Sequence, residues 1–204
     1  ISKGKYICLS EIKLYFISYF NILILGLSSG ETAVGYFVGA EKILRAIANL
    51  FAPILNTLFP ILTKKLNVSI TEAYSFINKI ALYSFAFLVL LCTSLFLLAD
   101  FIISNYYYNS DVSESIIVFK ILSFIPLLTF FDVFYGKFVL INLNKDKVFY
   151  QIILFLSIIN LPILYILTTN YGYIGTSFTI LISQFLLSFL SFFYAIKFMR
   201  KRMN

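Results

Sequence analysis

The residues best suited to chemistry in this chain are three charged side chains inside the apolar stretch 34–65, namely Glu41, Lys42 and Arg45. Each charge costs roughly 2.5–3.5 kcal/mol to place in hydrocarbon, so such residues normally face the interior of a helix bundle or a watery cavity. One face of a helix collects residues three and four positions apart. The stripe predicted here contains Lys42, Arg45, Asn49 and Asn56, with Glu41 at its edge.

This pattern favours the binding of an anion. Arginine presents a fixed fork of donors that suits phosphate, and lysine adds a point charge. Arg45 lies about eleven residues from the expected outer end of its helix, roughly 16 Å, which is near the middle of a membrane. The alternative is an ion pair between Glu41 and Arg45 that only holds helices together. We favour binding, because Lys42 leaves the cluster net positive.

Three further polar residues are candidates. Lys120 and Asp132 lie twelve positions apart, a rotation of about 120°, so they do not share a helix face. Asp132 would pair with Arg45 or Lys42, carry a coupling proton, or serve as a structural partner. Asn21 lines a polar path or bonds a neighbouring helix. We interpret the later residues Asn160, Ser183 and Gln184 as contacts between helices rather than as a site.

Other kinds of site find no support in the sequence. Cys8 and Cys92 lack ligand spacing and the chain has no histidine, so we predict neither a metal site nor a disulfide. Phosphate loops, nucleophile elbows and paired carboxylates are also absent from the sequence. We therefore predict no cofactor and no enzymatic activity.

Composition determines which elements hold these residues. The chain has 204 residues, of which 61% are hydrophobic and 12% charged, and its mean hydropathy is +0.94. A soluble domain of this size has too little interior for so much apolar surface. The net charge of +7 is divided among short clusters, so nucleic acid is not an expected partner. We predict an all-α, polytopic protein that contacts membrane lipids.

A membrane-spanning helix needs about 20 apolar residues. The breaks between apolar stretches carry turn residues and are short, so consecutive helices should be antiparallel neighbours. Gly35 and Gly39 form a GxxxG pair, which lets a neighbouring helix approach closely. We predict one six-helix transmembrane bundle over residues 1–204, with spans at 9–27, 34–62, 77–99, 114–143, 148–168 and 174–198.

Loop charges predict the orientation of this bundle. Lysine and arginine occur before or at the start of the first span and after the second, fourth and sixth, whereas the loops 28–33, 100–113 and 169–173 contain neither. Basic loops favour the cytoplasmic side. Both ends of the chain are therefore predicted to be cytoplasmic. The basic residues in this pattern are Lys3, Lys5, Lys13, Lys64, Lys65, Lys145, Lys147, Lys197, Arg200, Lys201 and Arg202.

The runs NILILGL at 21–27 and VGYFVGAEKILRAIANLFAPILNTLFPILTK at 34–64 resemble the Wzx-type polysaccharide and O-antigen flippases. These belong to the multidrug/oligosaccharidyl-lipid/polysaccharide exporter superfamily. The resemblance implies two six-helix halves around a cationic cavity, of which this chain would be the C-terminal half. A missing N-terminal six-helix half is then an expected partner.

The implied activity is to flip a polyprenyl-pyrophosphate-linked oligosaccharide across the bacterial inner membrane by alternating access, with an ion gradient as the driving force. The rival hypotheses are a multidrug or small-molecule exporter of the same superfamily and a membrane-embedded glycosyltransferase or polymerase. A structural module without activity is a third. Substrate binding is assigned to Lys42, Arg45, Glu41, Asn49, Asn56 and Asn21, and ion coupling or charge pairing to Asp132 and Lys120.

Overall fold

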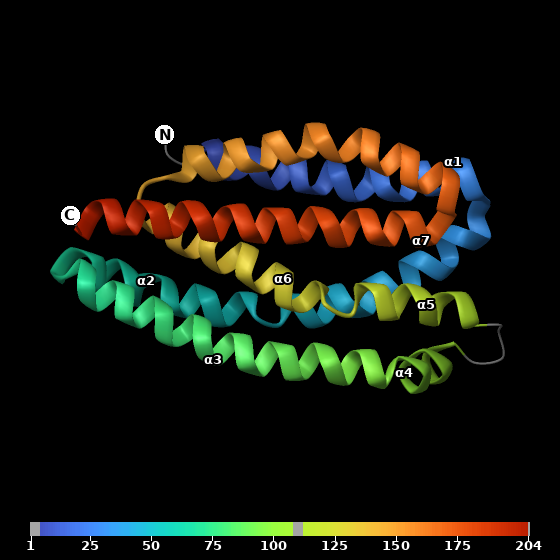
Figure 1. The fold of residues 1–204 in the computed structure, drawn as a ribbon, viewed down its shortest axis with the longest axis horizontal. Helices are drawn as coiled ribbons and strands as arrows, with labels where there is room; N and C mark the ends of the chain where they lie inside the picture. Colours follow the sequence, from blue (N-terminus) through green and yellow to red (C-terminus); the bar gives the residue numbers. More distant parts are fainter. Residues whose placement is uncertain (1–4, 108–111, 204) are drawn as a thin grey trace.

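The computed structural model describes residues 5–107 and 112–203, and these form helices without a strand. The helices lie side by side along one long axis, as Figure 1 shows. Four stretches of the described residues are long and apolar enough to cross a membrane, namely Ser18–Val68, Ile70–Leu97, Ser113–Leu140 and Asp146–Met203. The all-α, polytopic membrane class is thereby confirmed.

The first helix, α1 (Lys5–Asn49), consists of two arms that meet at Gly30. Gly30 has φ 82° and ψ 174°, a conformation that is open to glycine and strained for other residues. The chain reverses direction at this point (Figure 1). The second arm continues into α2 (Ala52–Val68) after an interruption at Leu50 and Phe51. Because Pro53 lacks a backbone N–H, the helical ladder cannot run through this point unbroken.

The helix α3 (Ile70–Leu97) begins where the hydroxyl of Ser69 accepts a hydrogen bond from the backbone N–H of Glu72. The short α4 (Ala99–Tyr106) follows it. The last long element, α7 (Asp146–Met203), again contains two arms, which meet at Gly172 with φ 55° and ψ −133°. The hydroxyls of Thr168 and Thr176 lie 2.9 Å apart and join these arms in the buried interior.

The predicted span at 114–143 overlaps the apolar stretch Ser113–Leu140, but it is not one uninterrupted α-helix. The structure divides it into α5 (Ser113–Leu122), α6 (Ile125–Asp132) and the π-helix η1 (Val133–Leu140). Pro126 lies at the start of α6, where its missing N–H costs no helical hydrogen bond. Ring atoms of Phe149 approach the backbone of Gly136 so closely that a Cβ there would meet them at 2.2 Å.

Two apolar clusters hold the helices together. One contains Leu62, Ile77 and Phe134, and the other contains Phe37 and Phe119, all of them fully buried or nearly so. Many large apolar side chains point outward instead, such as Leu82, Phe85, Phe101 and Phe189. An apolar exterior of this extent suits a lipid environment.

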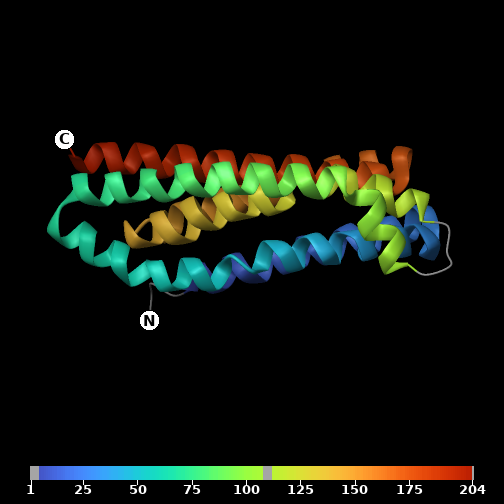
Figure 2. The ribbon, with the colours of Figure 1, turned by 90° about the horizontal axis from the view of Figure 1, so that it is seen from below.

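The ends of the bundle differ in charge. Figures 1 and 2 show the turn after α2, the start of α7 and its C-terminal end together at one end of the bundle. The reversals at Gly30 and Gly172 lie at the opposite end. The described basic loops thus share an end, as the charge pattern predicts. Lys3 and Asp111 lie outside the described residues, and the side chains of Lys5 and Lys13 are not described.

The count of six spans, the single-bundle domain and the cytoplasmic side of the basic end stay predictions. Two of the four apolar stretches contain a glycine reversal, Gly30 in the first and Gly172 in the last. Each of these stretches therefore has two arms that run in opposite directions along the bundle (Figure 2). This arrangement is compatible with the predicted antiparallel spans.

Candidate functional site

The charged cluster lies on the second arm of α1, and its neighbours determine how it is oriented. Phe37, Ala40 and Leu44 are buried in the apolar cluster around Phe119. Their spacing of three and four residues marks the side of the helix that faces the bundle. Glu41 lies beside this buried side and is 9% exposed, whereas Lys42 and Arg45 are exposed. Glu41 therefore faces the bundle interior, and the expectation that Lys42 and Arg45 face a watery cavity stays a prediction.

Glu41 and Arg45 form an ion pair. The Nε and Nη2 atoms of Arg45 both lie 2.7 Å from Oε1 of Glu41. The side chain of Glu41 is 11% exposed and that of Arg45 is 45% exposed. One edge of the guanidinium is thus fixed against the helix, and the rest of the side chain reaches the surface. The predicted ion pair is real, and it leaves an exposed cation beside Lys42.

The asparagine candidates occupy two different environments. Asn49 ends α1 and Asn56 lies in α2, and both are exposed like Lys42 and Arg45. Asn21 is on the first arm of α1 and only 3% exposed. Its Oδ1 has no hydrogen-bond partner among the described residues. The structure therefore does not present Asn21 on the same surface as the other candidates.

Lys120 and Asp132 have separate partners. Nζ of Lys120 lies 2.8 Å from Oδ2 of Asp100, which joins α5 to α4. A hydrogen bond from Lys120 lowers the pKa of the Asp100 carboxyl below its usual range. Asp132 is 6% exposed, and its Oδ2 accepts a hydrogen bond of 3.0 Å from Nε2 of Gln184. Arg45 pairs with Glu41, and the alternative pairing of Asp132 with Arg45 or Lys42 stays a prediction.

Sequence reasoning did not assign Gln184 to the site, although it is the partner of Asp132. The adjacent Ser183 donates a hydrogen bond to Oδ1 of Asn160, from one arm of α7 to the other. The sequence signal for these residues was their polar character within apolar stretches. Their interpretation as contacts between helices fits this geometry. Only the fold reveals that Gln184 turns toward a carboxylate from a different element.

The GxxxG interpretation is wrong for the described part of the chain. A Cβ on Gly35 would meet nothing within 4 Å. At Gly39 it would meet the hydroxyl of Tyr107, so a side chain rather than a helix backbone makes the close approach. The same hydroxyl donates to the backbone carbonyl of Gly35 at 3.4 Å.

Comparison with known proteins bears on the segment that carries the charged cluster. Residues 1–66 match a family model described as "Polysaccharide biosynthesis protein". These residues include both arms of α1 and most of α2, and with them Glu41, Lys42 and Arg45. The expected family resemblance is confirmed. No solved structure matched the chain.

Two curated relatives extend the resemblance beyond this segment. A "Putative O-antigen transporter" of Escherichia coli (strain K12) is 29% identical over 187 residues, which is 90% of this chain and 43% of that protein. A protein of the same name from Shigella dysenteriae is 24% identical over 172 residues, which is 83% of this chain and 42% of the relative. The chain thus spans less than half the length of the curated relatives it matches.

Proposed function

We propose that this chain forms the cation-bearing wall of a transporter that flips a polyprenyl-pyrophosphate-linked oligosaccharide, an O-antigen or other surface polysaccharide unit, across the bacterial inner membrane. The observation that carries the proposal is the half-exposed Arg45 beside exposed Lys42, within the segment that matches the polysaccharide family. The names of the relatives support transport of O-antigen as the class of activity.

The chemistry of the cluster suits a pyrophosphate. Glu41 holds Nε and Nη2 of Arg45, which restricts the guanidinium without burying it. A guanidinium that is held in place loses little further freedom when it binds an anion, and its remaining donors match phosphate oxygens. Lys42 adds a second positive charge, so the group of three is net positive. Exposed amides at Asn49 and Asn56 would serve sugar hydroxyls.

An exposed cationic face in a membrane protein needs a polar partner opposite it. The relatives are more than twice as long as the matched region. We propose that an N-terminal six-helix half supplies the second wall, and that the two halves alternate between inward and outward access. Asp132, a buried carboxylate bonded to Gln184, is the candidate for coupling this movement to an ion gradient.

The test is export of surface polysaccharide in cells that depend on the native gene. We expect Arg45→Ala to reduce surface O-antigen at least about tenfold at equal membrane protein level, because a charge-assisted contact to phosphate is lost. Arg45→Lys should retain part of the activity, since an ammonium keeps the charge without the fork. The readout is surface polysaccharide on a gel, normalised to tagged protein in the membrane.

A double variant separates binding from a purely structural ion pair. In Glu41→Ala with Arg45→Ala, neither charge is left unpaired. If this variant restores both protein level and export, the pair only stabilises the fold and the proposal fails. We expect the double variant to reach the protein level of the parent chain while its export stays low. Lys64→Ala, an exposed cation outside the cluster, is the matched control and should export normally.

A further inference from the structure

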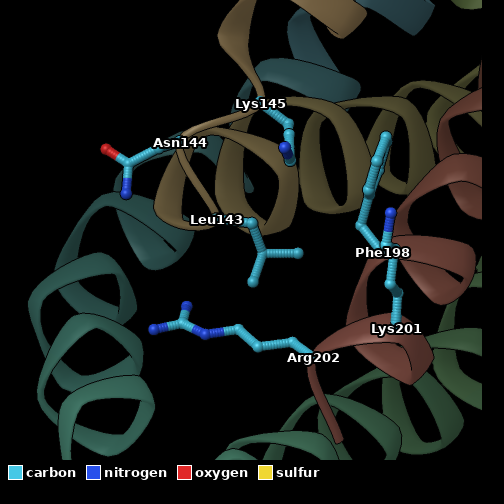
Figure 3. Close-up of a pocket in the computed structure, with 6 residues that line it drawn as sticks. All are labelled: Leu143, Asn144, Lys145, Phe198, Lys201 and Arg202. Carbon is cyan, nitrogen blue, oxygen red and sulfur yellow. The ribbon is translucent and has the colours of Figure 1, made fainter. Parts of the chain in front are cut away.

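A second cationic feature lies far along the chain from Arg45, where η1 ends and α7 both begins and finishes. It is a cavity of about 350 Å³. Figure 3 shows the turn residues on one side and the last turns of α7 on the other. Its lining consists of Leu143, Asn144, Lys145, Phe198, Lys201 and Arg202.

The shape of the turn follows from how the preceding helix ends. Asn144 has φ 57°, and its N–H bonds the carbonyl of Ile141 at 2.9 Å. The N–H of Lys145 bonds the carbonyl of Leu140 at 2.8 Å. These two bonds form a Schellman motif, in which asparagine is one of the few residues that tolerate the left-handed position. The motif fixes where the side chain of Lys145 leaves the backbone.

The charge of the cavity is of one sign. Three of its six lining residues are cations, Lys145, Lys201 and Arg202, and none is acidic. None of these three cations belongs to an ion pair within residues 5–107 and 112–203. Nζ of Lys145 lies 4.8 Å from the centroid of the Phe198 ring, which restrains it by a cation–π contact.

The cavity lies close to the ends of two apolar stretches, where a membrane–water interface is expected. Its lining residues lie near the ends of the apolar stretches Ser113–Leu140 and Asp146–Met203. Figure 1 shows the start and the end of α7 at the same end of the bundle. Leu143 and Phe198 add an apolar wall to the cationic one. A ligand that fits both walls carries a negative charge next to an apolar portion.

We propose that this cavity binds the phosphate headgroup of an anionic membrane lipid. Juxtamembrane clusters of lysine and arginine attract anionic lipids, by roughly thirtyfold in affinity for two charges. Arginine adds a bidentate geometry for phosphate oxygens. This inference is independent of the proposed transport function, because none of these residues belongs to the cluster around Arg45.

The test uses the full chain purified in detergent and titrated with phosphatidylglycerol or with phosphatidylcholine of the same acyl chains. Native mass spectrometry counts bound lipid, and thermal unfolding reports stabilisation. We expect preference for phosphatidylglycerol, and K201Q/R202Q should weaken its binding about thirtyfold while leaving phosphatidylcholine binding unchanged. K145Q is a second variant that removes a cation from the other side of the cavity, and it should weaken binding in the same direction.

The matched control is K197Q/R200Q, which removes two charges from the same helix end but does not touch the cavity. It should keep more of the binding than K201Q/R202Q does, because Lys197 and Arg200 do not line the cavity. Equal losses in the two double variants would mean that general attraction to the basic end explains binding, and the proposal would be overturned. Full competition by millimolar inorganic phosphate would assign the cavity to free phosphate and would equally overturn it.

Discussion

Glu41 and Arg45 are one helical turn apart, yet their side chains occupy different environments. The carboxylate is nearly buried against the bundle, whereas almost half of the arginine side chain is exposed. The structural and the functional interpretation of this pair are therefore compatible. Glu41 cancels one charge and orients the guanidinium, and Lys42 supplies the excess positive charge that an anion would need.

At Asp132 we expect the shape of the side chain to matter more for stability than its charge. Asp132→Ala removes the acceptor of the Gln184 amide and should lower the free energy of unfolding by about 1–2 kcal/mol. Asp132→Asn keeps an oxygen for Gln184 and should lose less. Thermal unfolding of the detergent-solubilised chain measures both effects. Equal losses in the two variants would show that the hydrogen bond to Gln184 contributes nothing specific.

The pair of Asp100 and Lys120 predicts a dependence on pH. The pKa of Asp100 is lowered from 3.8 in the folded chain, chiefly by its hydrogen bond to Lys120. A carboxyl whose pKa is lowered by folding stabilises the fold at pH values above its unfolded-state pKa. This stabilisation is lost as the pH falls through the pKa of the folded state. Lys120→Gln should therefore lower the unfolding temperature slightly at neutral pH, and by progressively less as the pH falls below 3.8.

Two measurements check this pair. Unfolding temperatures of the parent and Lys120→Gln chains are compared across the pH range, and again at high salt, where an exposed pair is screened. A difference that stays constant at acid pH would show that the lysine stabilises the fold by packing alone.

At the level of elements, glycines and prolines determine where the helices reverse or break. Gly30 and Gly172 have dihedrals outside the helical region and mark the two reversals. Pro53 and Pro126 follow the two interruptions within longer apolar stretches. The π-helix η1 starts directly after Asp132, and such stretches often accompany functional residues.

Gly175 packs against the backbone of the other arm of α7. A Cβ there would lie 2.0 Å from the backbone oxygen of Leu167, and a backbone atom cannot move aside as a flexible side chain does. We expect Gly175→Ala to destabilise the chain by about 1–3 kcal/mol, by forcing apart the two arms of α7. Thermal unfolding in detergent is the measurement.

Gly35→Ala is the matched control, because a Cβ there meets nothing within 4 Å. It should be neutral, or stabilising by up to about 1 kcal/mol through helix propensity. If Gly175→Ala is equally neutral, the arms of α7 separate more easily than this packing indicates.

For the whole molecule, the distribution of charge between the two ends of the bundle predicts its orientation in the membrane. The positive-inside rule predicts that the end with Lys65 and Lys147 is cytoplasmic. With Cys8 and Cys92 replaced by serine, cysteines at Glu31 or Asn170 should react with a membrane-impermeant maleimide in intact cells. A cysteine at Lys65 should react only after permeabilisation.

If Lys65→Cys is labelled in intact cells and Glu31→Cys is protected, the chain has the opposite orientation to the predicted one. Labelling at both ends would contradict the membrane-spanning arrangement itself. A cysteine at Leu82, an exposed apolar position within α3, is the control that should resist labelling under either orientation.

The sequence by itself determined the class of this protein and the position of its charged cluster. Apolar stretches of spanning length leave few alternatives to membrane helices, and a glutamate one turn before an arginine forms an ion pair because helical geometry brings them together. The family resemblance was visible for the same reason, since it lies in the continuous run that contains Glu41 and Arg45.

Tertiary structure decided which neighbours distant residues have. Lys120 binds Asp100 and Asp132 binds Gln184, pairings that join separate helices and depend on helix rotation and depth. The close approach at Gly39 comes from Tyr107, 68 positions away, instead of from a helix backbone. Local periodicity specifies one face of one helix, but which element packs against that face depends on the packing of the whole bundle.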